Sequence, residues 1–436
     1  MKNQVESILL KNVQVWNGNS FEFKSSFGVG KSGVYISDDK LANYTFEKEL
    51  DANNALVIPA FFALGLDFME PHRDDVYTFK DGAKAMRQGG FYGGLYESKA
   101  NPIDDSEKLS AAIERKNSIS KEHPLAIHFL GSYSVGFGSS QLSEMLELSE
   151  GFEASDGVAG FGDGSIPYPS VRFLRLAMEY GSMTGKRFFF QPNESSLLSH
   201  GIVHEGAYAD MLGMKGIPRI SETIAVYTIL ELSRFLKTPV HFKQITCGES
   251  LNLIRDARKK GIDVTCDVGI YHLLFDDSSL EPLRSNFHII PPLRAKKDRE
   301  ALIEGLLDGT VDAISMNHKP VLREDKEVNF EDSVPGALSL EVAVEALWNF
   351  LSEKLGAKKT IELLSVNPAK LAGAKPIAYA LDKESDINFI LLDKNKEHKI
   401  TRDFFAGHVS NSPLLFQTLP STLIGTYIGG LWTSVN

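Results

Sequence analysis

The feature that most constrains the fold is a regular alternation of apolar runs and helix-like stretches that begins near residue 56. The apolar runs have the length and composition of buried parallel strands. They read "LVIPAFFALGLDF", "GGFYGGLY", "PLAIHFLGSY", "GVAGFGDG", "KRFFFQPN", "PVHFKQIT", "IDVTCDVG" and "VDAISMNH". Strands of this number, spread over roughly 270 residues, fit the usual size of a closed (β/α)₈ barrel, the TIM barrel.

The stretches between these strands place apolar residues at helical spacing, and several end in Gly, as helices often do. Examples are "SVRFLRLAMEYGSMTG", "ISETIAVYTILELSRFLK", "SLNLIRDARKKG" and "DREALIEGLLDG". An open doubly wound sheet is the alternative, but it would need a Gly-rich phosphate turn after the first strand, and none is present. We therefore expect the barrel.

Both ends of the chain are rich in short strand-like runs. The first residues contain "SILLKNVQVWNG", "GVYISDDKLANYTF" and "NNALVIPA". After two helical stretches, "ALSLEVAVEALWNFLSEKLG" and "TIELLSVNPAKLAG", the tail contains "DINFILLDK", "STLIGTYIGG" and "LWTSV". Because chain ends often lie close together, we expect one small β-sandwich built from residues 1–56 and 375–436, with the barrel formed by residues 57–374.

Composition excludes several classes of protein. The net charge is -11, which disfavours nucleic acid because phosphate backbones require clustered Lys and Arg. No apolar run is long enough to cross a membrane, and the polar N-terminus Met1–Glu6 does not resemble a signal peptide. Two cysteines, Cys247 and Cys266, cannot supply a secreted disulfide framework and are expected to be small buried residues. We expect a cytoplasmic protein that binds neither nucleic acid nor membrane.

In a TIM barrel the functional residues lie at the C-terminal ends of the strands. Alternation along the first strand predicts that Gly65, Asp67 and Met69 share one face. The later strand ends provide Glu97, Lys99, Asp163, Gln191, Asn193, Gln244, Asp267, Asn317 and His318. A catalytic zinc needs about three His, Asp or Glu ligands, and side-chain amides are weak ligands. A carboxylate site for a harder cation, made by Asp67, Asp163 and Asp267, is the alternative.

Several blocks of the second half resemble a known family. They read "GMKGIPRISET", "PVHFKQITCGESLNLIRDARKKGIDVTCDVGIYHLLF", "IPPLRAKKDREALIEGLLDGTVDAISMNH" and "SVNPAKLAG". From about Ser7 to its end the chain is similar to the dihydroorotases of the cyclic amidohydrolase superfamily, particularly the longer bacterial type. The resemblance implies a metal-dependent hydrolase barrel with a β-sandwich, zinc, and hydrolytic opening or closing of the dihydroorotate ring in pyrimidine biosynthesis.

The positions that carry the family's chemistry are replaced here. The His-x-His pair, followed by Leu-Arg, reads Gly65-Leu66-Asp67-Phe68-Met69, so both histidines and the Arg that binds the substrate carboxylate are absent. The catalytic Asp, which transfers a proton between water and ring, is replaced by Asn317, and an amide cannot do this near neutral pH. The altered metal-ligand positions are Gly65, Asp67, Asp163, Gln191, Gln244 and Asn317. The positions expected to line the substrate pocket are Asp67, Met69, Glu97, Lys99, Asn193, Ile290, His318 and Val321.

These replacements predict a pseudoenzyme that needs no cofactor and has a structural or regulatory role. The resemblance suggests aspartate carbamoyltransferase as the partner, because inactive barrels of this family support that enzyme; self-association is the other option. We hypothesise that Lys99 pairs with nearby carboxylates and substitutes for the metal charge. His318 and His241 are expected to be packing residues, and His72 to lie in a solvated loop.

Two other functions stay open. One is an active dihydroorotase, or another cyclic amidohydrolase, with altered metal use. It would depend on the four acidic residues Asp67, Glu97, Asp163 and Asp267 and on His318. The other is a protein that binds a small ligand in the remodelled pocket without reacting.

Overall fold

The computed structural model describes residues 5–435 except 139, 152–156, 199, 282, 376, 378 and 382–386. Its centre is an eight-stranded parallel sheet in the order β15-β14-β13-β10-β9-β8-β7-β6. The strands are β6 (Phe61–Leu66), β7 (Phe91–Tyr96), β8 (Ala126–Ser132), β9 (Gly160–Gly162), β10 (Arg187–Phe190), β13 (Val240–Phe242), β14 (Val264–Gly269) and β15 (Ala313–Ser315). Each of the predicted runs therefore contributes one barrel strand, and the first run also contains β5 (Leu56–Pro59).

The first and last strands close the sheet into a barrel. The backbone N–H of Met316 donates to the carbonyl of Leu64 at 2.9 Å, and that of His318 donates to the carbonyl of Gly65 at 2.8 Å. Gly65 lies in the left-handed region with φ +74°, and a Cβ built on it would lie 3.1 Å from the backbone nitrogen of Asn317. Glycine thus permits the close approach of the two strands at the closing seam.

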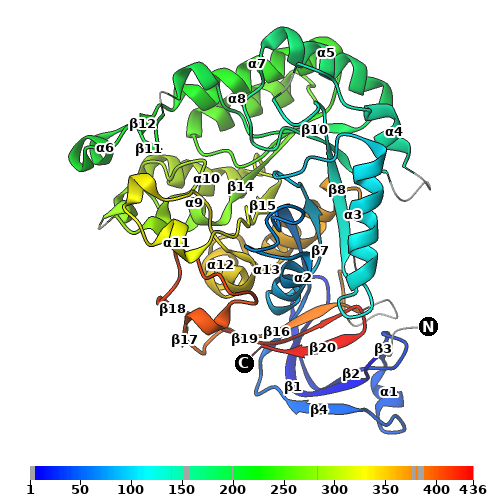
Figure 1. The fold of residues 1–436 in the computed structure, drawn as a ribbon. Coiled ribbons are helices and arrows are strands. Elements are labelled where there is room, and N and C mark those ends of the chain that lie inside the picture. The colour runs from blue at the N-terminus through cyan, green and yellow to red at the C-terminus, as the bar shows by residue number, and fades with distance from the viewer. Residues whose placement is uncertain are drawn as a thin grey trace.

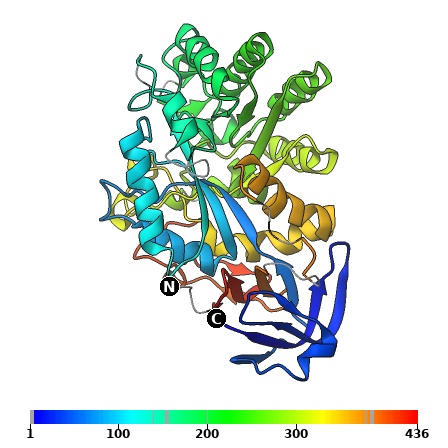
Figure 2. The same ribbon diagram turned by 90° about the vertical axis from the view of Figure 1, so that its right-hand side faces the viewer.

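Helices surround the barrel (Figures 1 and 2). They include α2 (Phe79–Gln88), α3 (Ser106–Ile119), α4 (Met145–Glu150), α5 (Val171–Gly181), α7 (Ile220–Leu236), α8 (Gly248–Lys259), α10 (Lys296–Asp308) and α12 (Leu340–Leu355). Local sequence fixes several of their beginnings. Thr78 and Asp81 form a capping box at α2, and Ser170 caps α5 by accepting from the backbone N–H of Phe173. The predicted helices therefore begin and end close to the residues that the spacing of apolar side chains indicated.

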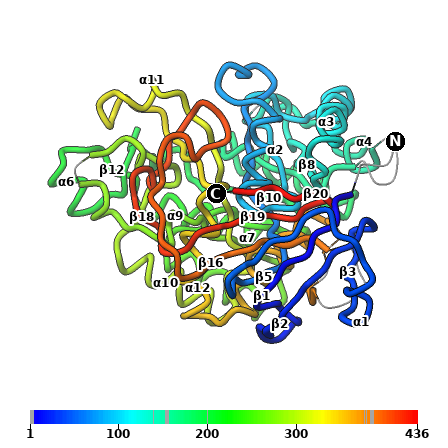
Figure 3. Tube along the Cα trace, turned by 90° about the horizontal axis from the view of Figure 1, so that it is seen from below, coloured from blue at the N-terminus to red at the C-terminus, as the bar shows by residue number. Residues whose placement is uncertain are grey.

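The two ends of the chain form a second sheet, of mixed direction, below the barrel in Figure 1. Its order is β20-β19-β16-β5-β1-β2-β3, with β4 paired to β1. The strands are β1 (Ile8–Trp16), β2 (Phe21–Val29), β3 (Tyr35–Ile36), β4 (Lys48–Asp51), β5, β16 (Phe389–Asp393), β19 (Thr422–Ile428) and β20 (Leu431–Ser434). In Figure 3 the blue N-terminal and red C-terminal strands run side by side across the base of the molecule. A sheet formed from both termini, as predicted, is present.

Some local predictions were wrong. The run "GVYISDDKLANYTF" gives only the two-residue β3 before the short helix α1 (Asp38–Leu41), because Asp38 and Asp39 suit the first turn of a helix better than a strand. Strand β2 was not predicted. The boundaries of the two proposed domains stay predictions. Residues 1–4, 376, 378, 382–386 and 436 of the proposed β-sandwich, and residues 139, 152–156, 199 and 282 of the proposed barrel, lie outside the described residues.

Short elements extend from the barrel. Between β10 and α7 the chain forms β11 (Val203–His204), α6 (Ala207–Leu212) and β12 (Gly216–Ile217), which project at the upper left of Figure 1. Near the last strands lie α9 (Ile270–Leu274), the 3₁₀ turn η4 (Ser285–Phe287), α11 (Arg323–Lys326) and the pair β17 (His398–Lys399) and β18 (Thr418–Leu419). The stretch after α12 forms α13 (Ala357–Ile361), a π-helical turn (Glu362–Val366) and α14 (Asn367–Leu371). No helix within the described ranges has both the length and the apolarity to cross a membrane.

Candidate functional site

The strand ends bring a buried ion-pair cluster together inside the barrel. The Lys243 ammonium lies 2.7 Å from Glu97 Oε2 and 2.9 Å from Asp163 Oδ1, and all three side chains are less than a tenth exposed. Glu97 follows β7, Asp163 follows β9 and Lys243 follows β13. The three groups therefore meet from separate strands, and we call them the lysine cluster.

Backbone donors hold the two carboxylates of the lysine cluster. Glu97 Oε1 accepts from the N–H of Gly164 at 3.0 Å, and Asp163 Oδ2 accepts from the N–H of Gln191 at 2.8 Å. Burial alone would lower the pKa of Lys243, but the charges of Asp163 and Glu97 raise it above its usual range. Burial opposes ionisation of Glu97, yet Lys243 holds the pKa of this carboxyl below its usual range. Lys243 is thus a fixed cation and not a nucleophilic amine.

A second buried pair lies beside the lysine cluster. His241 Nε2 lies 2.9 Å from Asp267 Oδ2, and His241 Nδ1 lies 2.8 Å from the hydroxyl of Thr265. The other oxygen of Asp267 accepts from the backbone N–H of Gln244 at 2.8 Å and from the hydroxyl of Ser315 at 2.5 Å. Both ring nitrogens of His241 and both carboxylate oxygens of Asp267 are thus hydrogen-bonded within the protein, which supports the structural role expected for His241.

The space between these pairs is small. Gly65, Glu97, His241, Lys243 and Gln244 are among the residues that line a cavity of about 20 Å³. That is enough for about one water molecule, whereas pockets for drug-sized ligands occupy about 300 Å³ or more. A substrate ring does not fit inside it.

Asp67 comes directly after β6 and is also buried. Strand β6 ends at Leu66, so the predicted alternation of Gly65, Asp67 and Met69 does not continue: Met69 has φ +64°, and its N–H donates to Asp67 Oδ1 at 3.1 Å. Burial raises the pKa of Asp67, and Lys99 opposes this shift. In the described part of the chain Lys99 forms no ion pair within 4.0 Å. The cation in contact with Glu97 and Asp163 is therefore Lys243, and Lys99 acts on Asp67 and Glu97 through its charge at longer range.

The last strand end carries Asn317 and His318. Asn317 Nδ2 donates to the carbonyl of Ile290 at 3.2 Å, so these two predicted site residues do meet. His318 Nδ1 accepts from the N–H groups of Ser339 and Leu340 at the start of α12, at 3.2 and 3.4 Å. Burial lowers the pKa of His318 to about 3, so it is neutral at physiological pH. These contacts support the packing role expected for His318.

Other predicted residues lie apart from the lysine cluster. Val321 lines a separate cavity near α11, where its N–H donates to Asn411 Oδ1 at 3.0 Å. Asn193 is partly exposed, and His72 lies in an exposed loop as expected. Cys247 and Cys266 are buried, and burial raises the pKa of both thiols, which fits their expected role as small packing residues.

These residues do not fit the zinc that the resemblance implies. Gly65 has no side chain to offer, and Gln191, Gln244 and Asn317 offer only amides. Asp163 and Asp267, two members of the alternative carboxylate site, are bonded to Lys243 and His241. Among the residues that the structure describes, no three His, Cys, Asp or Glu side chains are grouped so that they could hold a metal ion. We therefore derive no chemical step through a metal.

The sequence analysis did not predict Lys243 as a site residue, although its position in the strand run could have indicated it. In "PVHFKQIT" it stands two positions after His241, so it shares a face with that histidine. A lysine at an inward position of a strand expected to be fully buried requires a carboxylate partner. Its partner Glu97 is 146 positions away in the chain, which local patterns cannot reveal.

Comparison with known proteins finds sequence similarity to dihydroorotases. No protein-family model matches it. It is 28% identical to the dihydroorotase of Carboxydothermus hydrogenoformans over 410 residues, which cover 92% of this chain and 91% of the relative. It is also 28% identical to the dihydroorotase of Listeria monocytogenes over 427 residues, 97% of each chain.

The fold agrees with solved structures of hydantoinases. The L-hydantoinase (dihydropyrimidinase) of Arthrobacter aurescens superposes with a TM-score of 0.81 at 18% identity, covering 98% of this chain and 96% of that one. The D-hydantoinase of a Thermus species gives 0.76 at 18% identity, with 98% and 95% covered. The chain is thus similar in sequence to dihydroorotases along nearly its whole length, and it has the fold of hydantoinases.

Proposed function

We propose that this chain is a dihydroorotase-like protein that does not hydrolyse cyclic amides and instead has a structural or regulatory role in pyrimidine biosynthesis. The observation that carries the proposal is the position of the Lys243 ammonium, held between Glu97 and Asp163 inside the barrel. A lysine so placed supplies the positive charge that these buried carboxylates require. A second cation brought between them would meet its repulsion.

The remaining residues at the barrel mouth support the same conclusion. Hydrolysis of a cyclic amide needs a group that takes a proton from water and returns it to the ring nitrogen. Asn317 is an amide bonded to the carbonyl of Ile290, and His318 is a neutral imidazole that accepts from α12. The cavity beside Gly65 and Gln244 is also too small for a ring.

An exposed apolar face offers a place for a protein partner. On α7 the side chains of Ile224, Tyr227 and Phe235 follow one another at helical spacing and are 43%, 57% and 68% exposed. Leu176 of the neighbouring α5 is 47% exposed. Large apolar side chains gathered on a surface commonly mark an interface, which agrees with docking to aspartate carbamoyltransferase or with self-association.

The alternative is an active dihydroorotase or another cyclic amidohydrolase with altered metal use. Asp67 favours it, because its carboxyl is buried at the end of β6 and its Oδ2 has no hydrogen-bond partner among the described residues. Such an enzyme would have to displace Lys243 from its two carboxylates or work without them.

Elemental analysis of the purified protein, followed by assays of dihydroorotate hydrolysis and of carbamoyl aspartate cyclisation, separates the two functions. We expect substoichiometric zinc and no turnover above the uncatalysed reaction, with or without added zinc or manganese. One or two tightly bound metal ions together with turnover that the D67N variant loses would refute the proposal.

The partner is tested by mixing the protein with aspartate carbamoyltransferase from the same organism and measuring the mass of the complex by size-exclusion chromatography with light scattering. The variant Y227E should abolish a complex, or a self-associated form, that uses the α7 face. The variant F23E is the matched control. Phe23 is about as exposed as Tyr227, at 55%, but it lies on β2 in the sheet formed by both chain ends, away from α7. A monomer that binds no carbamoyltransferase would contradict the structural role.

A further inference from the structure

A second and larger cavity lies away from the barrel interior. Its volume is about 370 Å³, and its walls come from η4, from α11 and from residues 402–416 near the C-terminus. The residues that distinguish it are Arg284, Arg323, Lys326, Arg402 and Phe416, and we call it the basic pocket. Its volume lies in the range of small-molecule sites, about 300–1,000 Å³.

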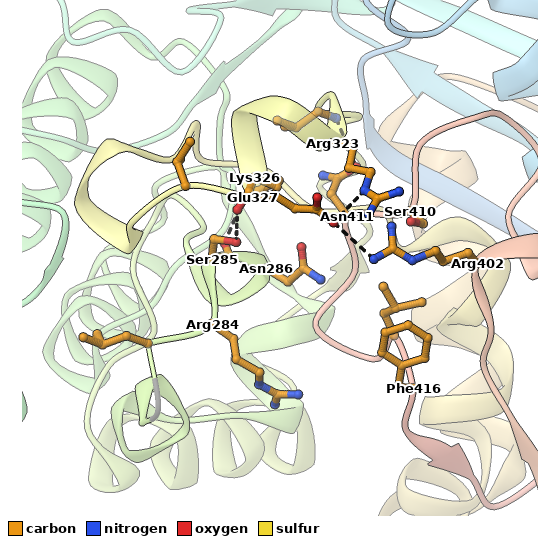
Figure 4. Close-up of a pocket in the computed structure, with 14 residues that line it drawn as sticks. Arg284, Ser285, Asn286, Arg323, Lys326, Glu327, Arg402, Ser410, Asn411 and Phe416 are labelled. Carbon is orange, nitrogen blue, oxygen red and sulfur yellow. Dashed lines mark hydrogen bonds and ion pairs between the residues drawn. The ribbon is translucent and has the colours of Figure 1, made fainter.

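Positive charge exceeds negative charge in the basic pocket, although the whole chain carries -11. Arg323 Nε and Arg402 Nη2 both donate to Glu327 Oε1, at 2.6 and 3.2 Å, so two guanidinium groups share one carboxylate oxygen. Figure 4 shows them approaching Glu327, with Asn286 facing them across the pocket. Arg284 lies over the ring of Phe287 at 4.7 Å and forms no ion pair in the described part of the chain.

Lys326 adds a buried cation without a carboxylate. Its ammonium donates to the backbone carbonyls of Ser285 at 2.9 Å and His288 at 3.2 Å, and the residue is only 4% exposed. Burial, and then the charge of Lys319, lower the pKa of Lys326 to about 7. A buried ammonium held by neutral carbonyls is costly in an isolated protein, and an anion nearby would stabilise it.

Phe416 contributes an exposed ring in a strained conformation. Its backbone has φ +67°, where bulky residues are rare, and its side chain is 53% exposed. The guanidinium of Arg402 lies 5.8 Å from the centre of this ring. Backbone strain of this kind is found often at ligand sites. The ring face of Phe416 therefore stands beside the cationic groups, and is accessible to a ligand.

We propose that the basic pocket binds a small molecule that joins a phosphate group to a planar ring, as a nucleoside monophosphate does. Arg323 and Arg402 keep further N–H groups that can donate in pairs to phosphate oxygens, the geometry in which guanidinium binds phosphate best. The planar ring would stack on Phe416, and its binding would extend the contact of Arg402 with that side chain. The pocket is separate from the lysine cluster, so this proposal does not depend on whether the barrel is catalytic.

Isothermal titration calorimetry with UMP, AMP, ribose 5-phosphate and uridine tests the proposal. We expect one site per chain for the monophosphates, weaker binding of ribose 5-phosphate, and no detectable binding of uridine. The double variant R323Q/R402Q should weaken binding of UMP or AMP by about tenfold or more, since it removes charge-assisted hydrogen bonds to phosphate. The variant F416A should bind UMP and AMP only as weakly as the unmodified protein binds ribose 5-phosphate.

The control is R234Q, which removes an exposed arginine paired to one carboxylate, Glu231, on distant α7. It should leave binding unchanged, and circular dichroism should show that all variants are folded. The proposal would be overturned if none of UMP, AMP and ribose 5-phosphate bound at millimolar concentration. It would also be overturned if R323Q/R402Q and the unmodified protein bound UMP or AMP with equal affinity. Equal affinity of ribose 5-phosphate and the monophosphates would refute the part played by the ring.

Discussion

Replacing Lys243 with methionine keeps an unbranched side chain, one atom shorter than lysine, and removes the cation from between Glu97 and Asp163. At an effective dielectric constant of about 20, each contact near 2.8 Å corresponds to about 6 kcal/mol of Coulomb attraction, offset in large part by desolvation. Removing one partner of a buried pair generally costs about 3–5 kcal/mol, because the other charge stays buried and uncompensated. We therefore expect K243M to lower the free energy of unfolding by about this amount at pH 8.

The pH dependence of K243M identifies the cause. Without the ammonium, the folded-state pKa of Glu97 should rise above the unfolded value, and the pKa of Asp163, which burial already raises, should rise further. The folded variant then binds protons that the unfolded chain has lost. Its stability should then increase as the pH falls from 8 towards 5, and the deficit relative to the unmodified protein should shrink. The triple variant E97Q/D163N/K243M, which has no buried charge in the cluster, should recover much of the loss.

Urea unfolding, followed by both circular dichroism and tryptophan fluorescence, measures these differences, provided that the two transitions coincide. The control is K259M, because Lys259 forms an exposed pair with Asp256 in which the side chains are 77% and 63% exposed. Such a pair contributes at most about 1 kcal/mol. If K243M is no less stable than K259M at pH 8, the lysine cluster is not the internal cation site that we infer.

Two further predictions concern packing. Burial raises the pKa of Glu345 to about 8, so the folded protein keeps a proton that the unfolded chain loses above pH 4.5, and stability should fall as the pH rises from about 4.5 to 8. In E345Q the side-chain amide oxygen can still accept from the N–H of Leu423. Thermal unfolding should show E345Q to be about 2–4 kcal/mol more stable than the unmodified protein at pH 9, and equally stable at pH 4. The same gain at both pH values would contradict this. G65A should destabilise the fold by about 1–3 kcal/mol, because φ is +74° and a Cβ would lie 3.1 Å from Asn317 N. The control is G185A, at an exposed turn where φ is also positive but nothing lies within 4 Å of the Cβ. If G65A loses no more stability than G185A, crowding at the seam does not contribute.

Much of the architecture could be predicted from local sequence. The strands of the barrel are short apolar runs between amphipathic helices, and both properties are set by neighbouring residues. The resemblance to dihydroorotases likewise implies, from sequence alone, that Gly65 and Gln244 stand where His is expected and Asn317 where Asp is expected. These positions indicated a site without the family's ligands before any coordinate was known.

The sequence did not determine which groups meet. Lys99 and Lys243 both follow barrel strands, and only the tertiary structure decided that Lys243 contacts Glu97 and Asp163. The same holds for the basic pocket, whose Arg284, Arg323 and Arg402 come from three separate segments. The physical reason is that local patterns fix the face on which a side chain lies, whereas the angle and stagger of the strands and the packing of the loops fix its distance from side chains far away in the chain.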